Sequence, residues 1–233
     1  MGTNIKITET LRTYALFTVN DAAKLIRKSA HYPKIFVSRL VKKGLAARIM
    51  RGKYTMQDDP IIFASSLYPP SYIALWSALS FHGMTEQIPK DIFVATGKKR
   101  AKINFKGVAI ETVHIKQIWG FDRHNYNGFI ITVSDKEKTL IDCVLTGIVP
   151  LHILYGGIEE KELNIEKLVS YLLRIKNSSL AKRIGWLMDK KGIDISKKLK
   201  NTIDSNYIPL EKGMGKAGKK NKKWKIIENT AIE

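Results

Sequence analysis

The sequence contains one cysteine, Cys143, among its 233 residues. A single cysteine excludes an intramolecular disulfide and any metal site built on paired cysteines, and it is typical of a reducing compartment. No charged-then-apolar segment near the N-terminus resembles a signal peptide. The uncharged stretch 143–158 is too short to span a bilayer, and three glycines and a proline interrupt it. We therefore expect a cytoplasmic protein that has no membrane segment.

Acidic residues are scarce near the N-terminus. Residues 1–57 hold twelve Lys and Arg against two acids, and no acid lies between Lys24 and Tyr54. The formal net charge of the whole chain is +19. A solvated helix usually places acids among its lysines to gain ion pairs one turn apart. Their absence therefore favours a phosphate-rich partner such as nucleic acid, although charge alone also fits a lysine-rich solvated surface.

The same region has the pattern of three helices followed by a β-hairpin. The second helix opens with Thr18 and Asp21 at the spacing of a capping box, and the third ends at Gly44. Two strand-like runs, LAARIM and KYTM, flank the turn at 51–52. This order is typical of a winged helix-turn-helix, whose second motif helix enters the major groove of DNA. We therefore predict a winged helix-turn-helix DNA-binding domain at residues 1–58.

The third helix divides into an apolar stripe and a polar face. Phe36, Val37, Leu40 and Val41 form the stripe, which is predicted to be core. The other face and the hairpin supply the predicted DNA-binding residues, which are His31, Lys34, Ile35, Ser38, Arg39, Lys42, Lys43, Arg48, Arg51 and Lys53. Of these, Ser38, Arg39 and Lys42 are expected near base edges, with Ile35 against a thymine methyl. The three on the hairpin are expected at phosphates or in the adjacent minor groove.

Two further basic segments are candidates for additional phosphate contacts. They contribute Lys98, Lys99 and Arg100 from the turn 97–102, and Lys219 and Lys220 near the C-terminus. The turn follows an expected strand, and a merely solvated role fits it equally well.

The remainder of the chain is predicted to form a second domain. The segment QDDP at 57–60 is the expected linker, and residues 62–233 are expected to form a mixed α/β domain with a small sheet and several helices, so the chain is α+β. Strands are predicted at 91–96, 107–115 and 128–133, and helices at 71–83, 134–145, 164–175, 178–192 and 196–203. The helix at 134–145 would open with a capping box formed by Ser134 and Glu137.

Four segments, spread over nearly the whole chain, resemble a known family. They read LVKKGLAARIMRGKYTM at the third helix and hairpin, SYIALWSALSFHGMTEQIPKDIFVAT and GFIITVSDKEKTLIDCV in the middle, and YIPLEKGMGKAGKKNKKWKIIEN near the end. Together they are similar to the AbiEi antitoxins, the transcriptional-regulator partners in AbiE-type (type IV) toxin–antitoxin systems.

The resemblance implies a DNA-binding transcriptional repressor that acts as the antitoxin of a toxin–antitoxin pair. The N-terminal domain would bind inverted repeats in its own promoter, and the C-terminal domain would neutralise a nucleotidyltransferase-like toxin. The resemblance also implies an ordered closing strand that contains Trp224, preceded by a mobile basic loop at 212–223. We expect a monomer or a weak dimer.

The sequence shows no recognisable catalytic motif. The five histidines lack metal-ligand spacing, and no phosphate-binding loop follows a strand. Cys143 is expected to be a buried small side chain. Asp135, Glu137 and Asp142 are expected to be charges at a helix start and on the surface.

The enzyme alternative for this sequence is a nuclease. Asp91 starts one expected strand and Glu111 lies in the next, but the lysine needed two residues after Glu111 is replaced by Val113. We therefore predict no enzymatic activity, no cofactor and no metal. The alternatives are a winged-helix protein-interaction module without sequence-specific DNA binding, and a DNA endonuclease with a degenerate active site.

Overall fold

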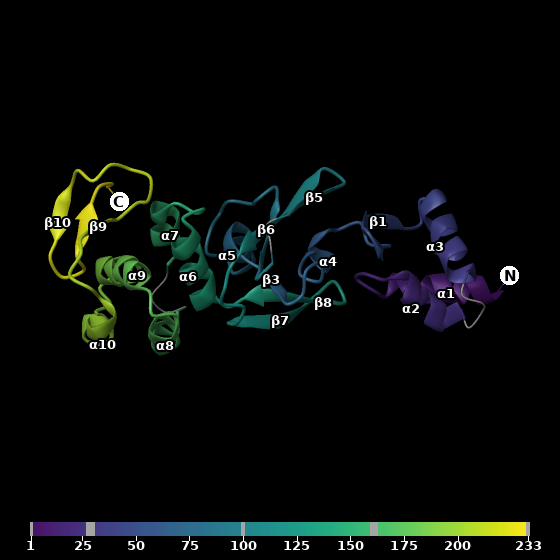
Figure 1. Ribbon diagram of the computed structural model, residues 1–233, viewed down its shortest axis with the longest axis horizontal. Helices are drawn as coiled ribbons and strands as arrows, with labels where there is room; N and C mark the ends of the chain where they lie inside the picture. Colours follow the sequence, from purple (N-terminus) through teal and green to yellow (C-terminus); the bar gives the residue numbers. More distant parts are fainter. Residues whose placement is uncertain (1, 27–30, 99–100, 159–162, 232–233) are drawn as a thin grey trace. The chain divides into compact units, whose positions relative to one another are not determined.

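The computed structural model describes residues 2–26, 31–98, 101–158 and 163–231 (Figure 1). The chain forms two compact units, and each contains several segments of the sequence. The first unit consists of residues 1–73, 90–116 and 123–133, and the second of residues 74–89, 117–122 and 134–233. The chain therefore passes between the units several times, whereas the sequence predicted one boundary at 59–61.

The first unit begins with three helices and a two-stranded hairpin, which we call the N-terminal module (residues 2–56). Its elements are α1 (Gly2–Arg12), α2 (Val19–Ile26), α3 (Tyr32–Lys42), β1 (Ala47–Met50) and β2 (Lys53–Thr55). The predicted capping box is confirmed, because the Asp21 carboxylate accepts from the backbone N–H of Thr18 at 2.8 Å and the Thr18 hydroxyl accepts from that of Asp21 at 3.2 Å.

A small apolar core holds the module together. Its buried members come from all three helices, from the connection between α1 and α2 and from the turn after α3, and they are Ile7, Leu11, Phe17, Ala22, Ile26, Phe36, Val37, Leu40 and Ala46. Three of the four residues predicted to form the core stripe of α3 are among them, and Val41 packs partly buried against the same cluster. Phe17 also bridges Tyr54 of β2 through two backbone hydrogen bonds, which ties the hairpin to the helices.

Most of a six-stranded mixed sheet belongs to the first unit, and only Phe121, Asp122 and Ser134 at its strand ends are assigned to the second. Its order is β5-β6-β4-β3-β8-β7. The strands are β3 (Ser71–Ile73), β4 (Ile92–Thr96), β5 (Lys102–Phe105), β6 (Val108–His114), β7 (Phe121–Tyr126) and β8 (Phe129–Ser134). The short helix α4 (Ile61–Ala64) lies in the same unit. The mixed α+β class is as predicted, and the three predicted strands correspond to β4, β6 and β8 within a larger sheet.

The helix predicted at 71–83 is wrong in its first part. Residues 71–73 form β3, where Tyr72 and Ile73 pair with Ala95 and Val94 of β4, and the helix α5 (Leu75–Phe81) follows. All three residues of β3 are buried. A fully buried strand gives a short continuous apolar run, which periodicity alone does not distinguish from a helix.

The expected linker at 57–60 is fastened within the first unit. The Gln57 side chain donates to the carbonyl oxygens of Arg12 and Tyr14, at 2.6 and 3.3 Å. Asp59 accepts from the Tyr126 hydroxyl at 2.9 Å. Apolar side chains of the module also pack against the core that lies under the sheet, and they include Leu16, Ile49 and Met50.

The second unit consists mainly of helices and a three-stranded sheet. Besides α5, its helices are α6 (Lys136–Thr146), α7 (Leu151–Gly157), α8 (Ile165–Ile175), α9 (Ser178–Lys190), α10 (Ser196–Leu199) and the 3-10 helix η2 (Lys200–Thr202). Its strands are β9 (Ile208–Pro209), β10 (Lys219–Asn221) and β11 (Ile226–Glu228), in the order β10-β11-β9. The closing strand is thus present, although Trp224 precedes it and is fully buried.

The start and the buried face of α6 differ from the prediction in two respects and agree with it in one. Asp135, not Ser134, caps the helix by accepting from the N–H of Lys138, because Ser134 is still the last residue of β8. The three acids expected at the surface, Asp135, Glu137 and Asp142, are buried. Each has a partner, and the Asp142 carboxylate pairs with the equally buried Lys138.

Cys143 is buried as expected, and burial raises the pKa of its thiol.

Candidate nucleic-acid interface

Helix α3 presents one side to the module core and the other to solvent. Pro33, Phe36, Val37 and Leu40 are buried. The residues predicted from this helix to bind DNA are all exposed, and they are His31, Lys34, Ile35, Ser38, Arg39, Lys42 and Lys43. Ile35 is 48% exposed, which is unusual for an isoleucine and leaves its side chain available for an apolar contact. The helical repeat therefore separates the two faces as the sequence predicted.

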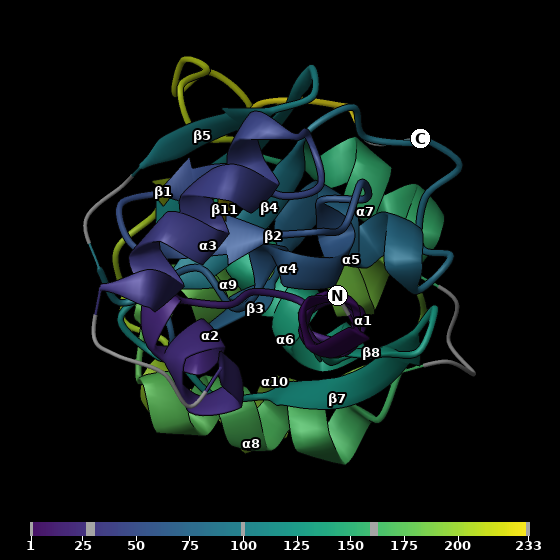
Figure 2. The same ribbon diagram turned by 90° about the vertical axis from the view of Figure 1, so that its right-hand side faces the viewer.

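A groove lies between α3, the start of α2 and the hairpin. Figure 2 shows α3 beside this hairpin, as does Figure 1. The groove has a volume of about 450 Å³, and its lining residues are Val19, Lys34, Ser38, Val41, Arg48, Arg51, Gly52 and Tyr54. It therefore brings together four of the predicted DNA-binding residues, two from the helix and two from the hairpin.

The hairpin owes its shape to its turn. Gly52 has a φ of +78°, a conformation that side chains other than glycine rarely adopt. The register shifts between Arg48 and Met50, so that Arg48 lies opposite Tyr54 while Met50 lies opposite Lys53. Both Arg48 and Arg51 are exposed and line the groove.

The groove is positively charged. Its lining includes three cations and no acid, and among the described residues none of these cations has a carboxylate within ion-pair distance. Asp21, the one acid of α2, is occupied by the backbone N–H and hydroxyl of Thr18. An acid-free groove with several arginines and lysines attracts phosphate, since each neutralised phosphate releases a condensed counterion.

The Lys53 side chain does not line the groove. Its ammonium donates to the carbonyl oxygens of Ser66 and Leu67, at 3.1 and 2.6 Å. Burial, together with the charge of Lys98, lowers the pKa of Lys53. These contacts hold the hairpin to the chain after α4, so we assign Lys53 a structural role inside the first unit and leave it out of the proposed DNA contacts.

The additional candidates are not part of the groove. Lys98 is exposed at the end of β4, and Lys99 and Arg100 lie outside the described residues. Lys219 and Lys220 are exposed on β10 in the second unit, where the Lys220 ammonium lies 5.4 Å from the centroid of the Tyr207 ring.

The groove also contains residues that the sequence did not single out. Val19 and Tyr54 line it, and the Tyr54 ring stacks on Phe17. The facing register of Arg48 and Tyr54 is the signal that would have identified Tyr54, because directly opposed residues of an antiparallel pair share a face.

The carboxylates weighed for a nuclease are used within the sheet. Glu111 pairs with Lys102 of β5 at 2.5 Å, and Asp91 accepts from the backbone N–H of Ala109 at 3.1 Å. In the part of the chain that the structure describes, no group of three His, Cys, Asp or Glu side chains is placed to hold a metal ion. None of the described helices is long and apolar enough to cross a membrane.

The chain resembles a solved structure, the crystal structure of the RV2827C protein from Mycobacterium tuberculosis. The match has a TM-score of 0.67 and covers 97% of this chain and 91% of that one, at 12% sequence identity. At this identity the likeness concerns the fold alone. No protein-family profile matches the chain, and no curated protein matches it.

Proposed function

We propose that the N-terminal module is a winged helix-turn-helix and that the protein is a sequence-specific DNA-binding repressor in the cytoplasm. The observation that carries this proposal is the acid-free groove, in which Lys34 and Ser38 of α3 face Arg48 and Arg51 of the hairpin. In this arrangement α3 enters the major groove, and the hairpin is the wing that contacts the adjacent backbone or minor groove.

The proposed contacts divide by chemistry. Arg39, Ser38 and Lys42 are exposed on α3, where side chains reach base edges, and Ile35 supplies an apolar surface for a thymine methyl. Arg48 and Arg51 bind phosphates and set the register of the protein on DNA without reading the sequence. Lys98 and the exposed lysines of β10 remain candidates for further phosphate contacts.

We further propose that the protein is the antitoxin of a toxin–antitoxin pair, with a nucleotidyltransferase-like toxin as its partner. The support for this part is the sequence resemblance to the AbiEi antitoxins, which extends over segments of both units. We assign toxin neutralisation to the region after residue 62 and autoregulation to the N-terminal module.

A charge-matched binding experiment tests the DNA part. Fluorescence anisotropy would compare a labelled duplex from upstream of the gene with a scrambled duplex of the same composition, between 50 and 200 mM salt, a range in which phosphate contacts change affinity strongly, by about 10³-fold or more. The Arg48→Gln/Arg51→Gln double variant is expected to reduce the slope of log affinity against log salt by about 2. The control is Lys6→Gln/Lys24→Gln, which removes the same charge from exposed positions of α1 and α2.

The control should keep the wild-type slope. An equal loss in both double variants would assign the affinity to bulk charge instead of the groove. Equal binding of the natural and the scrambled duplex by the wild type would favour the alternative of a winged-helix protein-interaction module.

The antitoxin part has its own test. The full chain would be co-expressed with the product of a neighbouring nucleotidyltransferase-like reading frame, and cell growth would be measured. The Arg48→Gln/Arg51→Gln chain should protect as well as the wild type, because the region after residue 62 is unchanged. We choose this variant over removal of residues 1–58, because removal would expose the sheet core on which Leu16, Ile49 and Met50 pack. Loss of protection in the double variant would contradict the proposed division between the two regions.

A further inference from the structure

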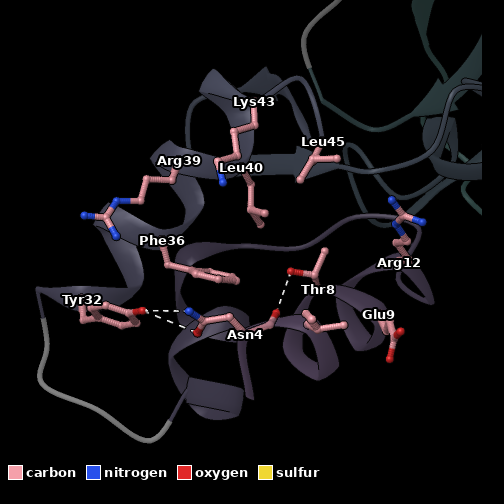
Figure 3. Close-up of a pocket in the computed structure, with 11 residues that line it drawn as sticks. Asn4, Thr8, Glu9, Arg12, Tyr32, Phe36, Arg39, Leu40, Lys43 and Leu45 are labelled. Atoms are coloured by element: carbon pink, nitrogen blue, oxygen red, sulfur yellow. Dashed lines mark hydrogen bonds between the residues drawn. The ribbon is translucent and has the colours of Figure 1, made fainter. Parts of the chain in front are cut away.

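A second cavity opens between α1 and α3 within the N-terminal module. It has a volume of about 400 Å³, and its walls are formed by residues of α1 between 4 and 12 and of α3 and the following loop between 32 and 45. Figure 3 shows the Phe36 ring and the Leu40 side chain directed into the space between the two helices. A cavity of this size, with an apolar interior and a few polar groups, is typical of a small-molecule site.

The rim of the cavity exposes two large apolar side chains. Ile5 of α1 is 58% exposed and Leu45, in the turn after α3, is 40% exposed. On the inner side, Tyr32 stacks on Phe36 with ring centroids 6.4 Å apart, and the Asn4 side-chain amide donates to the Tyr32 hydroxyl at 3.4 Å. The cavity therefore offers an aromatic and aliphatic surface that an apolar molecular body would cover.

The polar groups around this surface carry a positive charge. Arg12, Arg39 and Lys43 line the cavity together with a single acid, Glu9. Among the described residues, none of these three cations has a carboxylate within ion-pair distance. In Figure 3 the Arg39 guanidinium points away from the interior, whereas the Lys43 side chain runs down beside Leu40. An occupant that supplies one negative charge would complement this set.

We propose that the cavity binds a small amphipathic carboxylate, whose apolar body lies on Phe36 and Leu40 and whose carboxylate pairs with Lys43. This ligand class follows from the combination of an apolar interior with a net positive rim, since a neutral apolar ligand would leave the cations unused. A fully charged small anion would gain nothing from the apolar surface.

The cavity adjoins the residues proposed to bind DNA. Arg39 and Lys43 both line the cavity, and both are exposed residues that are predicted to bind DNA. A bound carboxylate neutralises charge that would otherwise face phosphate or a base, so ligand and DNA compete for the same side chains. This regulatory part rests on the proposed DNA-binding function, whereas ligand binding itself does not.

Three probe molecules separate the two chemical requirements. Calorimetry with the full chain would compare 2-naphthoate, its uncharged isostere 2-naphthamide, and acetate, which has the charge without the apolar body. We expect 2-naphthoate to bind at least about tenfold more tightly than 2-naphthamide, the value of one charge-assisted hydrogen bond. Acetate should show no saturable binding. The Lys43→Gln variant should bring the affinity for 2-naphthoate down to that for 2-naphthamide.

A matched pair of variants places the ligand in the cavity. Thr8 lines the cavity and Thr10 does not, yet each hydroxyl donates at 2.9 Å to the carbonyl oxygen four residues earlier on α1. Thr8→Trp fills the cavity and should abolish 2-naphthoate binding, whereas Thr10→Trp should leave it unchanged. Equal effects of the two tryptophans, or equal binding of the naphthoate and the amide by the wild type, would overturn the assignment.

The DNA arm distinguishes this inference from the proposed function. Saturating 2-naphthoate should weaken binding to the upstream duplex by about tenfold, within the usual range of coupling between ligands, and should leave DNA binding by Thr8→Trp unaffected. DNA binding without naphthoate binding overturns the inference alone. Naphthoate binding without DNA binding overturns the proposed function and the regulatory part that rests on it, and leaves the ligand site in place. A cavity closed by a second copy of the chain would appear as a dimer that Thr8→Trp dissociates, and it would also overturn the assignment.

Discussion

Arg48 lies directly opposite Tyr54 across the β1–β2 hairpin, and the Tyr54 ring stacks on Phe17 with centroids 5.8 Å apart and an interplanar angle of 27°. The backbones of Phe17 and Tyr54 also exchange two hydrogen bonds, at 2.8 and 2.9 Å. The connection between α1 and α2 is thus bonded to the middle of β2. We therefore expect the position of Arg48 beside α3 to depend on this aromatic pair, although neither ring carries a charge.

Replacement of Tyr54 tests that dependence. Tyr54→Ala removes the stack and should lower the free energy of unfolding by about 2 kcal/mol, since the ring is half-buried and pairs with another aromatic. It should also weaken DNA binding, because the hairpin loses its fixed position. Tyr54→Phe keeps the ring and is the control. Urea unfolding and fluorescence anisotropy would measure the two effects, and a loss in Tyr54→Phe as large as in Tyr54→Ala would show that the hydroxyl, not the stack, is responsible.

Arg39 and Arg51 should differ in what they recognise. Arg39→Ala removes a proposed base contact and should cost about 1–3 kcal/mol on the preferred site and much less on scrambled DNA. Arg51→Ala removes a proposed phosphate contact and should weaken binding to both duplexes equally. Anisotropy titrations of each variant against both duplexes give the comparison. An equal loss on both duplexes for Arg39→Ala would reassign Arg39 to the DNA backbone.

Gly185 of α9 leaves the space that the Trp224 ring occupies. A Cβ on Gly185 of α9 would lie 2.0 Å from the Trp224 ring, which is fully buried against the helix. Gly185→Ala should therefore lower the free energy of unfolding by about 1–3 kcal/mol through overpacking. The control is Gly156→Ala in α7, where no atom lies within 4 Å of the added Cβ. That variant should be neutral or stabilising, because alanine favours a helix over glycine by up to about 1 kcal/mol. Thermal unfolding of both variants would measure the two changes in stability. A Gly185→Ala variant as stable as the wild type would contradict the tight packing of α9 against Trp224.

Features that depend on neighbours in sequence were the predictable ones. The Thr18–Asp21 capping box and the separation of Phe36 from Ser38 on α3 follow from local spacing, and the structure has both. Asp135 was missed as a cap because the choice between it and Ser134 depends on where β8 ends, and β8 ends where its pairing in the sheet stops. Local patterns do not contain that information.

The candidate site was predictable in its exposed charges but not in its geometry. Helical spacing placed Arg39 on the outer face of α3, but it could not assign Arg39 to the second cavity and Lys34 to the groove. Lys53 has the same local context as Arg51, yet its ammonium binds two carbonyls of residues 66 and 67, which only the tertiary fold brings near. The sequence thus shows that the turn is basic, but it does not show which groups each basic side chain contacts.

The pair formed by Lys182 and Asp204 predicts a pH dependence of stability. The Lys182 ammonium lies 2.6 Å from the Asp204 carboxylate, and the lysine side chain is almost fully buried while the aspartate is half exposed. Hydrogen bonds from Lys182, and further ones that involve Ser178 and the backbone of Asn206, lower the pKa of Asp204 from 3.8 to about 2. The folded chain therefore keeps this carboxylate charged at pH values where the unfolded chain protonates it. Its contribution to stability is fully present above about pH 4 and is lost as the pH falls towards 2.

Asp204→Asn should remove that contribution and leave the buried Lys182 ammonium without its charged partner. The variant should be less stable than the wild type at pH 7, and the difference should shrink steadily between pH 4 and about pH 2, where about half of the wild-type carboxylates are protonated in the folded chain. Asp58→Asn is the matched control, because Asp58 pairs with Lys106 but is 89% exposed, and water screens such a pair. Urea unfolding at a series of pH values would measure both differences. A gap between wild type and Asp204→Asn that stays constant down to pH 2 would show that the amide disturbs packing around Lys182 and that the carboxylate charge is not the stabilising element.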